Sequence, residues 1–364
     1  MTVPSGSLTS IALQKFKQNF WGVFSFSIIC LVGLAALFAY VLAPDSSSNA
    51  NQMHLSIHSK PPGFKVDILT IPGSSEVGNS QSVLSKIFFG SKSTVTEVPL
   101  NSYRLEGNVL YYTEYSNLNL QDEKSINLSL FKAVPSDIIE TKRFWFGTDK
   151  YGRDYLSRVL IGSRISFSIG FVAVLISLLL GLLMGSVAGY YGGRWDTVIM
   201  WIINVTWSIP TLLLVIAITL ALGKGFWQVF IAVGLTMWVE VARIVRGQIM
   251  SVKEMQYVTA ARALGYKDFR IISKHILPNI MAPIIVICAA NFAAAILIES
   301  GLSFLGIGAQ PPVASWGSMI RDHYNYIILG QPYLALIPGV CIMLLVMSFM
   351  LVGNALRDAF DVKA

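Results

Sequence analysis

Two stretches of this sequence contain residues at a spacing that could bind phosphate or a metal ion, and neither completes its pattern. Gly73–Ser80 has the glycine spacing of a phosphate-binding loop, but Asn79 stands where that loop needs a lysine. His54 and His58 lie four residues apart, as two metal ligands on a helix would, but no third ligand is evident and Ser and Asn surround them. We therefore interpret them as surface histidines, with a shared metal as the alternative.

No Ser-His-Asp or Cys-His grouping stands out elsewhere, so we expect a protein that is not an enzyme. We expect no cofactor and no metal in this chain. Any ATP-driven work would need ATP and Mg²⁺ on a partner subunit.

A polar, basic segment lies between two apolar runs, at Tyr257–Pro278 (YVTAARALGYKDFRIISKHILP). This segment contains the small residues Ala260 and Ala261 and, after them, Gly265, which can make a sharp turn. This pattern predicts two short helices joined at the glycine. Together they would form a compact knob suited to a groove on another protein.

The composition is that of a membrane protein. Hydrophobic residues make up 54% of the chain, charged residues only 13%, and the mean hydropathy is +0.60. The net charge of +7 could suggest a nucleic-acid partner. However, the basic residues cluster beside apolar runs, as membrane topology requires, so we expect none. All three cysteines fall inside apolar runs, and no disulfide framework is readable.

Six apolar runs are long enough, or nearly so, to cross about 30 Å of hydrocarbon. They are 24–43, 165–190, 197–222, 225–239, 276–298 and 333–354. The fourth run is short, and we expect its helix to continue past Glu240. The first run is interpreted as a retained anchor, because it is longer than a signal-peptide core and no clear cleavage site follows it.

Lysine and arginine predict the orientation of the chain in its membrane. Lys15 and Lys17 precede the first run, and seven basic residues crowd the loop after the fourth. An even number of crossings separates the two regions, so both are expected in the cytoplasm. The chain would then be a multi-pass protein with cytoplasmic N- and C-termini, surrounded by lipid.

The segment 44–145 has no spanning run and by parity lies outside the cytoplasm. Strand-like pieces at Phe64–Ile71, Tyr103–Leu105 and Val109–Thr113 predict a small β-containing insertion, and Glu106-Gly107-Asn108 is a hairpin signal. An irregular loop is the alternative. The predicted organisation is therefore 1–43 (N-terminus and first span), 44–145 (insertion) and 146–364 (five spans with a cytoplasmic loop at 243–275).

Further residues predict how the spans pack. Gly181, Gly185 and Gly189 recur every four residues, a spacing that lets another helix approach closely. Pro210 and Pro283 are expected to bend or locally open their helices. The Gly/Asp-rich turn at 147–154 predicts a short amphipathic helix capped by Asp154, ahead of a span that begins near Ser163, with an ordinary helix entry as the alternative.

Four stretches together resemble the oligopeptide/dipeptide/nickel subfamily of binding-protein-dependent ABC permeases, in its second-permease form. They are FGTDKYGRDYLSRVLIGSRIS (146–166), YVTAARALGYKDFRIISKHILPN (257–279), ESGLSFLGIGAQPPVASWG (299–317) and LRDAFD (356–361). The match covers about Phe146 to the C-terminus. The chain departs from typical dipeptide permeases in the length of 44–145.

This resemblance implies an all-α polytopic protein of the bacterial inner membrane with a type I importer core. It implies a second homologous permease subunit, two ABC ATPase subunits and an extracytoplasmic solute-binding protein as partners. Residues 257–279 would be the EAA coupling loop on which an ATPase docks. The docking residues would be Thr259, Ala260, Ala261, Arg262, Leu264, Gly265 and Asp268, with Thr259 in place of the loop's glutamate.

The function predicted from the sequence is that of a permease subunit of an ATP-driven importer for peptides or a related small solute, working by alternating access. An ion-coupled secondary transporter is one alternative, but four of the apolar runs contain no ionisable residue that could bind the ion. A membrane-anchored interaction or sensor protein is another, although six spans exceed what an anchor needs.

Overall fold

The computed structural model describes residues 8–72, 82–91, 95–116, 122–128, 138–223 and 225–360. The chain divides into two compact units. The first, here called the helical unit, comprises residues 1–33, 166–310 and 339–364, and the second, the sheet unit, comprises 34–165 and 311–338. The glycine-rich stretch at Gly73–Ser80 lies outside the described residues.

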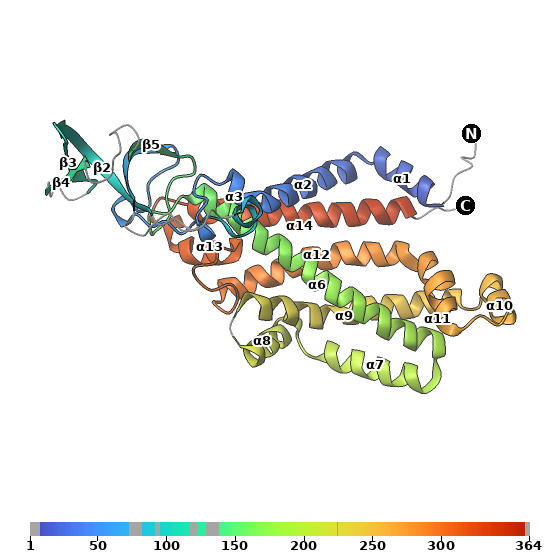
Figure 1. Cartoon of the computed structure of the whole chain (residues 1–364). Coiled ribbons are helices and arrows are strands. Elements are labelled where there is room, and N and C mark those ends of the chain that lie inside the picture. Colours follow the sequence, from blue (N-terminus) through green and yellow to red (C-terminus); the bar gives the residue numbers. More distant parts are fainter. Residues whose placement is uncertain are drawn as a thin grey trace. The chain divides into compact units, whose positions relative to one another are not determined.

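The helical unit contains the long apolar helices, and Figure 1 shows α7, α9 and α12 running alongside one another. Three of its helices, α2, α6 and α14, continue into the sheet unit. In chain order the elements are α1 (Leu8–Gln18), α2 (Phe20–Leu37), α6 (Tyr155–Tyr191), α7 (Gly193–Ser208), α8 (Thr211–Leu222), α9 (Phe226–Val252), α10 (Gln256–Ala263), α11 (Asp268–Arg270), the π-helical turn η4 (Ile271–Ile276), the 3₁₀ turn η5 (Leu277–Ile280), α12 (Met281–Phe304) and α14 (Tyr333–Phe360).

Within the described ranges, five helices are long and apolar enough to cross a membrane, and there are six spans if the bent pair α7 and α8 counts as one. The predicted polytopic all-α fold is therefore confirmed. The bend of 95° falls at Pro210, whose missing N–H and fixed φ favour a helix boundary. Pro283 lies in the first turn of α12, where a proline breaks no helical hydrogen bond.

The glycine stripe of α6 packs directly on α9. A Cβ atom added at Gly181 would lie 2.5 Å from the Val241 side chain, and one at Gly185 would lie 2.6 Å from the carbonyl oxygen of Ala242. At Gly189 the nearest atom would be the carbonyl oxygen of Arg246, at 2.9 Å. Real Cβ atoms do not come this close, so the two backbones approach as near as they do only because these residues are glycine.

Aromatic side chains hold a second contact among the long helices. The rings of Phe292 in α12 and Phe349 in α14 stack with their centroids 3.9 Å apart, and Phe167 of α6 lies edge-on to Phe292 at 5.4 Å. Gly170 faces the Phe292 ring, and its missing side chain leaves room for it. Three segments far apart in sequence thus share one packed cluster.

The sheet unit is built on five antiparallel strands in the order β4-β3-β2-β1-β5. The strands are β1 (Phe64–Pro72), β2 (Val95–Glu106), β3 (Val109–Glu114), β4 (Glu123–Asn127) and β5 (Ile139–Phe144). Around them lie α3 (Ala39–Leu42), η1 (Ser48–Ala50), η2 (Leu55–Ile57), α4 (Val83–Phe89), α13 (Trp316–His323) and η6 (Tyr324–Ile327).

Alternating residues along the strands are buried on the two opposite faces of the sheet. Leu69, Leu100 and Leu110 pack together on one face, while Ile57 and Phe144 belong to a cluster on the other. The predicted hairpin is present, since Glu106 pairs with Val109 and Gly107 has φ +59°. A small sheet therefore exists within 44–145, as predicted.

Two local predictions are wrong. The residues after the 147–154 turn do not form a separate amphipathic helix, because α6 runs without a break from Tyr155 to Tyr191. His54 is also not a surface residue. It is buried, and its Nε2 lies 3.2 Å from Oε2 of Glu97, while His58 is exposed. In the described part of the chain no three His, Cys, Asp or Glu side chains gather as a metal site would require.

The glycine contact between α6 and α9 leads to a prediction. Gly185→Ala should destabilise the helical unit, because the added methyl group meets backbone on α9, and overpacking of this kind costs about 1–3 kcal/mol. The measurement is the thermal midpoint of the purified protein in detergent. Gly247→Ala is the matched control, since a Cβ atom there meets nothing within 4 Å and alanine favours a helix. An equal fall in the thermal midpoint of both variants would contradict this packing.

Candidate functional site

The predicted turn at Gly265 ends helix α10 in a defined geometry. Gly265 has φ +75°, and its N–H donates to the carbonyl oxygen of Arg262 at 3.0 Å. The N–H of Tyr266 donates to the carbonyl oxygen of Ala261 at 3.2 Å. These two bonds define a Schellman motif, which favours glycine at this position because other residues rarely adopt a positive φ. The chain then turns into α11.

One face of the loop packs on its own protein. Val258 and Ala261 of α10 are buried with Ile271 and Ile276 of η4, in a cluster that includes Ile249 near the end of α9. Ala261 is only 4% exposed and faces the chain's own core, and its docking role stays a prediction. Its small size allows α10 to lie close to the rest of the loop.

The opposite face is open. Thr259, Ala260, Arg262, Leu264, Gly265 and Asp268 are all exposed. The sequence analysis did not name Phe269, which is 81% exposed beside the exposed Lys267 and Arg270. The sequence feature that could have identified Phe269 is an aromatic residue in a polar, basic segment, two residues before Ile271. An exposed apolar pair, Leu264 and Phe269, within a basic rim is typical of a protein-binding surface.

The exposed face is tied back to α6 and α9. The Tyr190 hydroxyl at the end of α6 donates to Oδ1 of Asp268 at 2.7 Å, and Arg262 lies over the Tyr190 ring. Arg246 of α9 makes a two-pronged ion pair with Asp196 of α7, with Nη2 at 2.6 Å from Oδ2. These contacts join the loop to α6, and α9 to α7.

A cavity of about 190 Å³ with a partly polar lining lies beside the break between α7 and α8. Its lining includes the hydroxyl-bearing Thr206, Thr211 and Thr236, and Glu240 near the middle of α9. Glu240 is exposed and α9 extends past it, as the sequence predicted. An ionisable side chain in such a helix usually faces a partner subunit or water.

The sheet unit contains a second polar site, at the 147–154 turn. Gly147 and Gly152 both have positive φ, and a Cβ atom at Gly152 would lie 1.8 Å from the carbonyl oxygen of His54. Thr148 Oγ1 donates to the carbonyl oxygen of Ile57 at 2.6 Å and accepts from the N–H of Lys60 at 2.8 Å. Residues 147–154 therefore hold the backbone of residues 54–60 in place.

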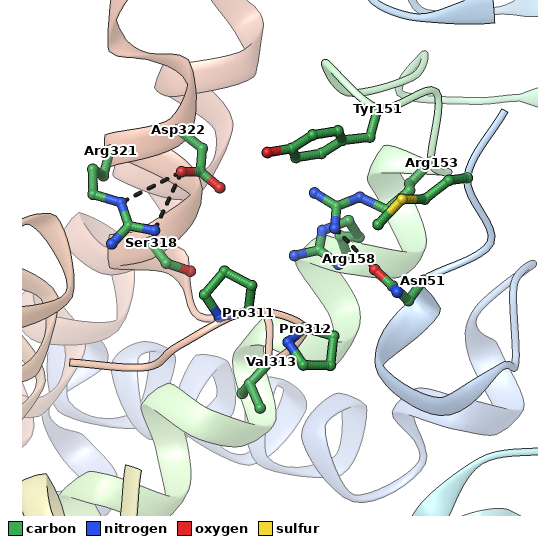
Figure 2. A pocket seen from close by; sticks show the side chains of 11 residues that line it. Asn51, Tyr151, Arg153, Arg158, Pro311, Pro312, Val313, Ser318, Arg321 and Asp322 are labelled. Carbon is green, nitrogen blue, oxygen red and sulfur yellow. Dashed lines mark hydrogen bonds and ion pairs between the residues drawn. The ribbon is translucent and has the colours of Figure 1, made fainter. Parts of the chain in front are cut away.

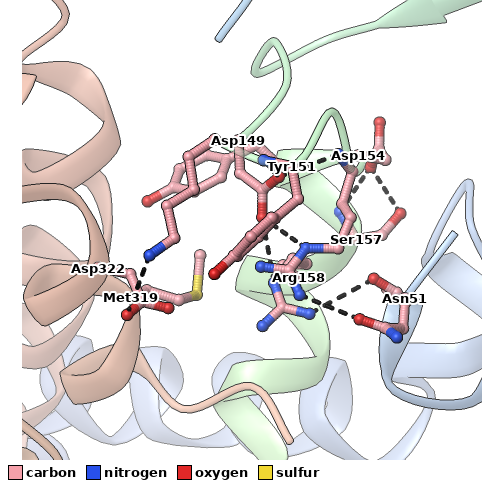
Figure 3. Close-up of polar contacts among 12 residues, drawn as sticks. Asn51, Asp149, Tyr151, Asp154, Ser157, Arg158, Met319 and Asp322 are labelled. Carbon is pink, nitrogen blue, oxygen red and sulfur yellow. Dashed lines mark hydrogen bonds and ion pairs between the residues drawn. The ribbon is translucent and has the colours of Figure 1, made fainter. Parts of the chain in front are cut away.

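Asp149 is the hub of this turn, and Figure 3 shows the contacts around it. Its fully buried carboxylate accepts from the N–H of Tyr151 at 2.8 Å and from Arg153 Nε at 2.6 Å. Arg158 Nε lies 3.7 Å from the same carboxylate. Asp154 caps α6 as predicted, accepting from the N–H and the hydroxyl of Ser157 at 2.7 and 2.6 Å.

Burial acts on the pKa of several ionisable groups in the sheet unit, among them Asp154, His323 and Glu97. It raises the pKa of Asp154, against the lowering effect of the Ser157 hydrogen bonds. It lowers the pKa of His323, whose Nδ1 contacts the carbonyl oxygen of Met319 at 2.8 Å while Nε2 accepts from the N–H of Lys150. A neutral ring with the proton on Nδ1 fits both contacts. At Glu97 burial opposes the charge, but contacts with His54 and Lys142 leave the pKa lowered.

Known proteins were compared with this chain. Residues 159–363, more than half of the chain, match the family of binding-protein-dependent transport system inner membrane components. The chain is 45% identical to the dipeptide transport system permease protein DppC of Bacillus subtilis (strain 168) over 219 residues, which is 60% of this chain and 68% of that protein. It is 41% identical to the oligopeptide transport system permease protein OppC of the same organism over 223 residues, 61% of this chain and 73% of that protein.

A solved structure of the MetNI methionine ABC transporter in inward-facing conformations is also similar. It is 17% identical, with a TM-score of 0.46, and covers 56% of this chain and 95% of that chain. The matched family range begins after β5, so the sheet lies outside it. The matched range, the spans and the identities to transport permeases lead to one conclusion: the chain is a multi-pass membrane protein that belongs to the binding-protein-dependent permease family, as a permease subunit of an ABC importer that works with ATPase subunits and another permease.

Proposed function

We propose that this subunit imports peptides or a closely related small solute, and that the 257–279 loop receives the motion of an ATPase. The observation that carries the proposal is the loop's two-sided structure. One face is anchored in the chain's own core at Val258 and Ala261, and the other presents Leu264 and Phe269 to a partner. The names of the dipeptide and oligopeptide relatives support peptides as the substrate class.

The docking surface we propose consists of Thr259, Ala260, Arg262, Leu264 and Phe269. The short side chains of Thr259 and Ala260 let another protein approach α10 closely, while Leu264 and Phe269 supply the apolar anchor. Asp268 acts indirectly, because it holds the Tyr190 hydroxyl and so fixes the loop on α6. ATP binding and hydrolysis on the partner would then move α9 through the loop.

We further propose that the solute path passes the cavity at the α7–α8 break, where Thr206, Thr236 and Glu240 give a polar lining within apolar helices. A solute-binding protein would deliver the solute from outside the cell. Coupling to an ion gradient has less support, because Glu240 faces a cavity without a second described ionisable side chain lining it. A role as a membrane-anchored sensor would leave the α10–α11 surface without a use.

The coupling role of Gly265 is testable. Gly265→Val forces a β-branched residue into a left-handed conformation, at a cost of about 1–2 kcal/mol, which is enough to depopulate the turn roughly five- to thirtyfold. A Cβ atom there meets nothing within 4 Å, so the effect comes from the backbone and not from a clash. We expect dipeptide import by the reconstituted complex to fall about tenfold while the protein still inserts.

Gly265→Asn is the matched control, because asparagine tolerates this conformation better than other residues with side chains. It should retain most of the import rate. Normal import by Gly265→Val would show that the turn does not couple ATP hydrolysis to transport.

The proposed orientation places the 257–279 loop and both termini in the cytoplasm and the sheet outside. Single cysteines at Lys267 and Ser125, both exposed positions, can report this in a background without Cys30, Cys288 and Cys341. An impermeant thiol reagent on intact spheroplasts should label Ser125→Cys, and should label Lys267→Cys only after lysis. The reverse pattern would invert the topology.

A further inference from the structure

The sheet unit contains a cavity of about 490 Å³ that the coupling function does not use. Figure 2 shows it between the 151–158 segment, the 311–313 loop and α13. Its lining residues are Asn51, Met53, Tyr151, Arg153, Arg158, Pro311, Pro312, Val313, Ser318, Arg321 and Asp322. This volume is that of a small-molecule site, and about half of the lining is apolar.

Positive charge dominates the polar part of the lining. Three arginines, Arg153, Arg158 and Arg321, face a single lining carboxylate, that of Asp322. Asp149 lies just behind Arg153 and Arg158 and balances only one of them. Lys150, at 3.5 Å from Asp322, adds a further cation. Four cations and two carboxylates around the cavity leave an excess of two positive charges.

The two inner arginines are held in place before any ligand arrives. Arg153 and Arg158 are only 3% and 4% exposed. Arg153 Nη1 donates to Oδ1 of Asn51 at 3.0 Å, and Arg158 Nη1 donates to the carbonyl oxygen of Asn49 at 3.2 Å. Arg158 Nε is buried and has no hydrogen-bond partner among the described residues. A buried arginine with an unused N–H, as Arg158 has, is costly unless a further acceptor joins it.

The third arginine is positioned differently. Among the described residues, the polar partner of Arg321 is its sequence neighbour Asp322, at 3.3 Å from Nη2, and the Arg321 side chain is 25% exposed. No long-range contact of the fold depends on it among the described residues. Its guanidinium group is therefore available to a ligand, and Figure 2 shows it across the cavity from Arg153 and Arg158.

We propose that this cavity is a binding subsite for the C-terminal carboxylate of a small peptide. A guanidinium group binds a carboxylate through two parallel hydrogen bonds, and three of them surround the space. Met53, Tyr151, Pro312 and Val313 would receive the apolar side chain next to that carboxylate. The peptide assignment rests on the proposed function, whereas the preference for an anion rests on the arginines alone.

Dialanine and its C-terminal amide are the probes, because they differ only in the charged group. Binding to the assembled transporter in nanodiscs, without a solute-binding protein, is measured by saturation-transfer NMR. We expect the wild-type complex to bind dialanine at least tenfold more tightly than the amide. Equal binding of the two probes, or no binding of dialanine, would overturn the proposal.

Arg321→Gln should remove most of this discrimination, and Arg321→Lys, which keeps the charge but loses the planar fork, should keep part of it. Arg143→Gln is the matched control, since Arg143 is exposed on β5, stacks on Trp145 and does not line the cavity. Discrimination that persists unchanged in Arg321→Gln would contradict the assignment of that residue.

Two further measurements distinguish the carboxylate subsite from a protein-docking site and from the proposed peptide import. If Arg321→Gln weakens binding of the solute-binding protein while the wild-type complex binds both probes equally, the cavity is a protein-docking site and the proposal is wrong. Import of labelled dialanine is measured in parallel on the wild-type complex. Probe discrimination without import would contradict peptide import but support the carboxylate subsite. Import without probe discrimination would support peptide import but contradict the carboxylate subsite.

Discussion

The close approach of α6 to α9 is the constraint on which the helical unit depends. Three glycines of α6 have no side chains to keep the two backbones apart, so α9 packs directly against the α6 backbone. In a membrane, where lipid is as apolar as leucine, such van der Waals contact is what favours one helix pair over another. One end of this contact leads into the 257–279 loop, because α9 continues into that loop and Tyr190, one residue before the end of α6, donates to Asp268.

Stiffness follows from that packing, and the coupling role proposed for the loop requires it. The loop is not a flexible tether, since Val258, Ala261, Ile271 and Ile276 are buried as thoroughly as residues deep in the helices. A partner that moves its outer face must therefore move α9 as well. The π-helical and 3₁₀ turns between Ile271 and Ile280 are the point where regular hydrogen bonding is relaxed, and a change of angle between the loop and α12 is least costly there.

Sequence patterns predicted most of this arrangement, because the features concerned are local. Apolar length predicts the spans, Pro210 the broken third span, Gly265 the left-handed turn, and Asp154 the cap of α6. The patterns failed where a residue's partner is distant in sequence. His54 was interpreted as exposed, but Glu97 buries and pairs it. Asp149 is missed for a different reason, because its partners Arg153 and Arg158 are near in sequence but spacing does not reveal that the three side chains are buried together.

The placement of Ala261 shows the same limit on a finer scale. An Ala-Ala pair predicts a small-residue face but not which alanine points outward, since adjacent helical positions lie about 100° apart. The outward face was fixed by Val258, which is three residues before Ala261 and shares its inner side. Leu264 is again three residues on, but it follows the end of α10 and escapes that periodicity, so an apolar side chain is left exposed. The helix end at Gly265 thus does two things, because it turns the chain and also presents an apolar contact that a continuous helix would have buried.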